Sequence, residues 1–99
     1  MKIKPGVQVS LIQPQALLAI IIAQDIYRDL KQDLVLTSGD DGTHIQDSLH
    51  YQGFAFDIRT RNLSISEKLS AFQQLTRNLG QLYDVVMHET HIHVEYDPK

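Results

Sequence analysis

Two segments far apart in the chain alternate apolar and polar side chains with a period of two, the spacing of a β-strand that buries one face. They are GFAFDIRT, residues 53–60, and HIHVEY, residues 91–96. Their apolar sides carry Phe54, Phe56, Ile58, Ile92, Val94 and Tyr96. Their other sides carry the ionisable residues Asp57, Arg59, His91, His93 and Glu95. Such strands need a sheet with one covered face and one open face, which constrains the fold more than any other feature.

Two amphipathic helices are predicted to cover the apolar face of this sheet. One spans residues 14–31, since Pro14 suits a first helical turn and a row of apolar side chains recurs at every fourth position. That row is Leu18, Ile22, Ile26 and Leu30, with Ala19, Ala23 and Tyr27 beside it. The second helix, within residues 64–80, opens with a capping box and closes at Gly80. Its predicted apolar stripe is Leu69, Phe72, Leu75 and Leu79.

The remaining segments complete an α+β order. Residues 34–36 predict a short buried strand that ends by Gly39, and the turn formers of 39–48 predict a loop. Residues 83–88 predict a strand that forms a hairpin with 91–96. We therefore expect one domain, residues 1–99, with a small, mainly antiparallel sheet and two helices on one of its faces.

Composition excludes several classes of function. The formal net charge is −3 and the basic residues are scattered, so we expect no nucleic-acid partner. The longest apolar run, residues 16–23, is far shorter than the ~20 residues of a membrane span. No signal peptide is recognisable at the N-terminus, so we expect synthesis in the cytoplasm without an export signal. No long apolar stripe is left that would demand a partner chain, so we expect a monomer. With no cysteine, a metal site in this chain must use His, Asp and Glu.

The five histidines fall in two short segments, residues 44–50 and 88–93. A loop that carries His50 could fold back over the strand that carries Asp57, and His93 could join them from another strand. Two imidazoles and one carboxylate bind Zn²⁺ and leave a fourth position for water, as in catalytic zinc sites. The alternative is that these histidines are ordinary hydrogen-bonded surface residues, because H-x-H arises readily by alternation.

These residues also carry a family resemblance. SLHYQGFAFD, residues 48–57, fits S-x-H-x-x-G-x-A-x-D, and HIHVEYDP, residues 91–98, follows after a helix and a strand. The chain resembles the zinc D-Ala-D-Ala metallopeptidases over residues 34–97. That family includes bacterial DD-carboxypeptidases, vancomycin-resistance dipeptidases and phage endolysins. Residues 44–60 are also similar to the hedgehog signalling domain, which shares the fold.

The resemblance implies a hedgehog/DD-peptidase-like fold with one zinc ion on the helix-free face of the sheet. It implies that His50, Asp57 and His93 are the zinc ligands. It also implies a metallopeptidase that hydrolyses an amide bond in the stem peptides of peptidoglycan, as a carboxypeptidase or endopeptidase. Such an enzyme would act on the cell wall once it is released or delivered there.

The resemblance leaves the catalytic base open between two residues. His88 fits the H-x-x-H-x-H spacing of some DD-carboxypeptidases, whereas many relatives place a glutamate shortly before the metal-binding histidine, as Glu89 is here. Both could instead form the polar tip of a hairpin. His91 is expected to donate a hydrogen bond to the oxyanion or to orient a neighbouring group.

Other positions differ from the family or support the site indirectly. His44 and Ser48 could hold the loop that carries His50, and for Ser48 a loop-capping role unrelated to a metal is at least an equal alternative. Relatives often carry a substrate-binding arginine after a Ser-Gly pair, where this chain has two aspartates. Arg59 and Arg61 could replace it, but a solvated surface role is the stronger expectation for each. An endopeptidase would need that arginine less. Two further possibilities are a non-catalytic zinc-containing binding module and a purely structural relative without metal.

Overall fold

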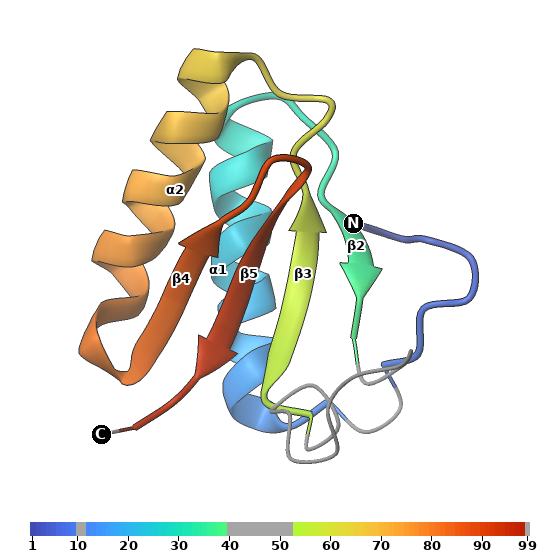
Figure 1. The fold of residues 1–99 in the computed structure, drawn as a ribbon, viewed down its shortest axis with the longest axis vertical. Helices are drawn as coiled ribbons and strands as arrows, with labels where there is room; N and C mark the ends of the chain where they lie inside the picture. The colour runs from blue at the N-terminus through green and yellow to red at the C-terminus, as the bar shows by residue number, and fades with distance from the viewer. Residues whose placement is uncertain (10–11, 40–52, 99) are drawn as a thin grey trace.

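The computed structural model describes residues 1–9, 12–39 and 53–98, which form one sheet with two helices against it (Figure 1). The helices are α1, Pro14–Asp29, and α2, Ile65–Leu79. The strands of this described part are β1 Lys2–Ile3, β2 Val35–Ser38, β3 Ala55–Arg59, β4 Tyr83–Met87 and β5 His91–Tyr96. None of the described helices is long and apolar enough to span a membrane.

The sheet has the order β1-β2-β3-β5-β4. Strand β1 runs parallel to β2, and the three other pairings are antiparallel, which confirms the predicted α+β class and mainly antiparallel sheet. The sequence did not predict β1, because two residues are too few to show an alternation. This edge strand is held by two backbone hydrogen bonds to the segment of β2, from Lys2 N to Leu34 O at 2.7 Å and from Lys4 N to Leu36 O at 2.9 Å.

Helix α1 begins at Pro14 as predicted but ends at Asp29, two residues before the predicted end. Lys31 has a φ of 60°, so the backbone has left the right-handed helical region there. The buried side is Ala16, Ala19, Ile20, Ala23, Ile26 and Tyr27. Leu18 of the predicted row is instead 55% exposed. Alanines allow a helix to approach its neighbours closely, so α1 packs along its small side chains and turns Leu18 outward.

Helix α2 shows the predicted capping box. Ser64 Oγ accepts a hydrogen bond from Glu67 N at 3.1 Å, and Glu67 Oε1 accepts one from Ser64 N at 2.8 Å. The helix ends before Gly80, whose φ of 74° lies in the region that favours glycine. In the predicted stripe Leu69 is 46% exposed, and Ala71 takes part in the buried side in its place.

The hydrophobic core lies between the helices and one face of the sheet (Figure 1). Its fully buried members include Tyr27, Leu36, Phe56, Ile58, Leu75, Ile92 and Val94. The hydroxyl of Tyr27 donates a hydrogen bond to the carbonyl oxygen of Arg59 at 2.9 Å, and burial raises the pKa of this phenol. The opposite face of the sheet, called the open face below, carries no helix of the described chain.

Candidate metal centre

The pairing of β3, β5 and β4 arranges side chains of the open face in rows across the sheet. Asp57 lies opposite His93, and Val86 lies opposite His93 on the other side. One row further along, Arg59 lies opposite His91. In the row on the other side of His93, Ala55 and Asp84 flank Glu95. Alternation along each strand turns all of these side chains away from the core. The predicted metal ligands Asp57 and His93 therefore share one row.

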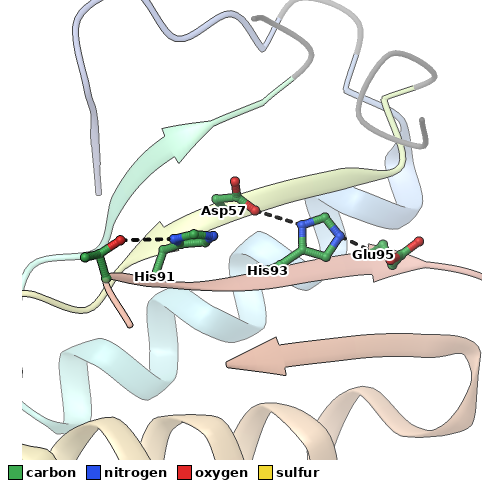
Figure 2. Close-up of polar contacts among 5 residues, drawn as sticks. Asp57, His91, His93 and Glu95 are labelled. Carbon is green, nitrogen blue, oxygen red and sulfur yellow. Dashed lines mark hydrogen bonds and ion pairs between the residues drawn. The ribbon is translucent and has the colours of Figure 1, made fainter. Parts of the chain in front are cut away.

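Both ring nitrogens of His93 contact carboxylates (Figure 2). Nδ1 lies 2.8 Å from Asp57 Oδ1, and Nε2 lies 3.1 Å from Glu95 Oε1. The three side chains are largely shielded, with exposed fractions of 19% for His93, 16% for Asp57 and 23% for Glu95. The hydrogen bond to Asp57 raises the pKa of His93, the negative charges of Asp57 and Glu95 add to this, and burial opposes it.

The Asp57–His93 pair has the donor atoms and the spacing of a zinc half-site. Zinc bonds of about 2.0–2.1 Å at tetrahedral angles separate two ligand atoms by about 3.3 Å. The 2.8 Å between Nδ1 and Oδ1 lies within a small side-chain adjustment of that value. A carboxylate oxygen and an imidazole nitrogen also suit zinc chemically. These two residues therefore fit the ion that the family resemblance implies.

Three of the predicted site residues lie outside the described residues. They are the third predicted ligand, His50, and the two predicted supporting residues, His44 and Ser48. Their roles stay predictions.

The two candidates for the catalytic base occupy different surroundings. The ring of His88 stacks on that of His91, with centroids 4.6 Å apart, and His88 N donates a backbone hydrogen bond to His91 O at 2.8 Å. His91 Nδ1 also lies 3.2 Å from Thr90 Oγ1. Glu89 is exposed at the β4–β5 turn, where its carbonyl oxygen accepts a hydrogen bond from Lys68 Nζ at 2.8 Å. His88 is thus tied to the histidines of the open face, and Glu89 sits at the tip of the turn.

A set of three carboxylates that the sequence analysis missed adjoins His93. Asp84, Glu95 and Asp97 each offer an oxygen within 4.8 Å of the others, a spacing at which they could hold a metal ion. Oxygen-only ligand sets suit Ca²⁺ or Mg²⁺ better than zinc. Alternation places Glu95 on the open face, but only the β4–β5 register brings Asp84 opposite it. Glu95 thus belongs both to this cluster and to the surroundings of His93.

Comparison with known proteins gives one family. The model of the Hedgehog amino-terminal signalling domain matches residues 12–96. That domain has the zinc peptidase-like fold, in agreement with the helices on one face of the sheet and the Asp57–His93 pair on the other. Comparisons with curated proteins and with solved structures gave no significant match. Since the family model covers most of the sequence, from the start of α1 to the end of β5, the chain belongs to the Hedgehog amino-terminal signalling domain family.

Proposed function

We propose that this chain is a zinc-dependent hydrolase of amide bonds in the stem peptides of peptidoglycan. The observation that supports the proposal is the Asp57–His93 pair, at 2.8 Å on a sheet face that no described helix covers. A structural zinc site is usually closed by four protein ligands, whereas a site on an open sheet face is accessible to a substrate. The S-x-H-x-x-G-x-A-x-D motif that ends at Asp57 supports the same chemistry.

In this proposal Asp57 Oδ1 and His93 Nδ1 are two zinc ligands, and His50 is the third. Glu95 Oε1, 3.1 Å from His93 Nε2, would accept a hydrogen bond from Nε2–H and so favour the tautomer whose Nδ1 is free to bind a metal. When bound, zinc supplies an activated water near neutral pH and polarises the scissile carbonyl. Asp57 and Glu95 together fix the orientation of the His93 ring from both of its nitrogens.

His88 is the favoured general base, because it stands on the open face beside His91. It would take a proton from the attacking water and return it to the leaving amine. The contact with Thr90 supports a role for His91 in this proposal. If Nδ1 accepts a hydrogen bond from the Thr90 hydroxyl, the ring proton lies on Nε2, which can then donate a hydrogen bond to the carbonyl oxygen of the substrate.

The test is digestion of purified peptidoglycan by the zinc-loaded chain, with mass spectrometry of the fragments and measurement of released amine. Hydrolysis is expected, and His93→Ala should lose both zinc and activity. Hydrolysis that survives in the His93→Ala variant would refute the ligand assignment.

His88→Ala and Glu89→Ala form a matched pair from the same turn. His88→Ala should keep zinc and lose about 10²–10⁴-fold in kcat. Glu89→Ala should change kcat little, and the reverse result would make Glu89 the base.

A second candidate function is that of a non-catalytic zinc-containing binding module. The family match favours it, because that family is described as a signalling domain. The same experiment separates the two functions. One equivalent of bound zinc with no release of amine would support the binding module and contradict the hydrolase.

A further inference from the structure

A polar cavity of about 250 Å³ lies beside the Asp57–His93 pair, at the end of β3 that adjoins the β4–β5 turn. Its lining residues are Lys4, Thr37, Arg59, Arg61, Thr90 and His91. Thr37, Arg59 and His91 alternate with the core residues Leu36, Ile58 and Ile92, so the cavity opens on the open face. Thr60 N donates to Thr90 O at 3.1 Å, which holds the end of β3 against the turn.

The cavity, called the basic pocket below, concentrates positive charge in a chain of net charge −3. Lys4, Arg59 and Arg61 all line it, and the described residues that line it include no acidic side chain. Within residues 1–9, 12–39 and 53–98, the structure gives these three side chains no ion pair. Cations gathered without a counter-charge repel one another, and an anion in the pocket would remove that repulsion.

Two other cations of the chain are paired with carboxylates. Lys2, close to the pocket in sequence, lies 2.9 Å from Asp33 Oδ2, and Arg28 on α1 is paired with Asp25. Thus these two surface cations have carboxylate partners, whereas the cations of the basic pocket face a cavity. Lys31, Lys68 and Arg77 also have no ion pair within the described residues, so the observation that points to an anionic ligand is the gathering of three cations around one cavity.

The pocket is one row from the candidate metal centre. Arg59 and His91 are Cα partners, and Asp57 and His93 are the next such pair on the same face. Two residues along a strand span roughly 7 Å. An extended peptide rises about 3.3–3.6 Å per residue. A peptide whose carbonyl lies at the Asp57–His93 pair therefore reaches the pocket with a group one or two residues away.

We propose that the basic pocket binds a carboxylate of the peptide substrate, either its C-terminal carboxylate or a side-chain carboxylate, one or two residues from the bond that is cut. Arginine is suited to this role, because its planar guanidinium donates two parallel hydrogen bonds to one carboxylate. The position of the bond that is cut rests on the proposed function, but anion binding by the pocket does not.

The test is an NMR titration of the metal-free, ¹⁵N-labelled full chain, in which the guanidinium Nε–H signals of arginine are followed. The probes are N-acetyl-D-alanyl-D-alanine, with a terminal carboxylate, and N-acetyl-glutamate α-amide, with a side-chain carboxylate. The dipeptide with its C-terminal amide is the uncharged control. At least one carboxylate probe should shift the Arg59 and Arg61 signals in a saturable way, and the tighter probe identifies the carboxylate source. The amide should bind at least about tenfold more weakly.

Variants complete the experiment. Arg59→Gln and Arg61→Gln should each weaken the preferred probe at least about tenfold. Arg77→Gln, in the last turn of α2, is the matched control and should leave affinity unchanged. Equal binding of acid and amide would overturn the proposal, as would unchanged affinity in Arg59→Gln or tighter binding of inorganic phosphate than of both peptides. The titration needs no zinc, so a failure to detect hydrolysis would not affect this inference. If hydrolysis is observed but the Arg59 and Arg61 signals do not shift, this inference fails and the proposed function stands.

Discussion

Removal of the Glu95 carboxylate should weaken zinc binding through His93. Glu95 Oε1 lies 3.1 Å from His93 Nε2, and the Glu95 side chain is 23% exposed. Partners of this kind change metal affinity about 10- to 100-fold when they are mutated. Glu95→Gln keeps a neutral acceptor of the same shape in a partly hydrated position, so we expect the low end, about tenfold or about 1.4 kcal/mol. Glu95→Ala leaves Nε2 without this acceptor and should approach the high end, about 100-fold.

The assay is competition for zinc between each variant and a chromophoric chelator of known affinity. Asp84→Asn is the matched control, because Asp84 lies opposite Glu95. This substitution removes one negative charge from the same row of the sheet without changing the Glu95 side chain. If orientation of the ring is what matters, Asp84→Asn should cost much less affinity than Glu95→Gln. Equal losses in the two variants would mean that Glu95 acts only through its charge. An unchanged affinity in Glu95→Ala would refute the orienting role.

Three further predictions concern stability, measured by urea denaturation of the metal-free chain. The pKa of His93 is raised above 6.5, so its stabilising contribution is complete below pH 6.5 and is lost as the pH rises through the raised value. Asp57→Asn should flatten that pH dependence, and an unchanged slope would contradict the assignment. Tyr27→Phe removes the hydrogen bond to the Arg59 carbonyl and should cost about 1 kcal/mol. Ser64→Ala should cost about 1 kcal/mol through the lost cap of α2, and a loss near zero would contradict that role.

The fold was predictable where local signals are complete. Ser64 and Gly80 delimit α2, because a capping box and a glycine with positive φ act through residues close in sequence. The buried side of α1 was less predictable. Periodicity identifies large apolar side chains, but close approach of the helix depends on small ones, so Ala19 is buried and Leu18 is 55% exposed.

The candidate site was predictable in composition and only partly in geometry. Strand alternation placed Asp57 and His93 on the same face, and the structure confirms that they lie together. Their contact depends on the β3–β5 register across 36 residues of sequence, which no local pattern contains. The β3–β5 register also places Arg59 beside His91 in the basic pocket, and the β4–β5 register brings Asp84 opposite Glu95. Those features therefore required the structure.

The strand order has a consequence for how the site forms. Strand β5 follows every other described strand along the chain, yet it lies inside the sheet, between β3 and β4. It supplies His93 and Glu95, whereas Asp57 lies on β3. A nascent or truncated chain without β5 has no half-site, however well its helices are formed. Zinc affinity thus reports insertion of this strand, and zinc in excess should slow the release of β5 more than the fraying of α1.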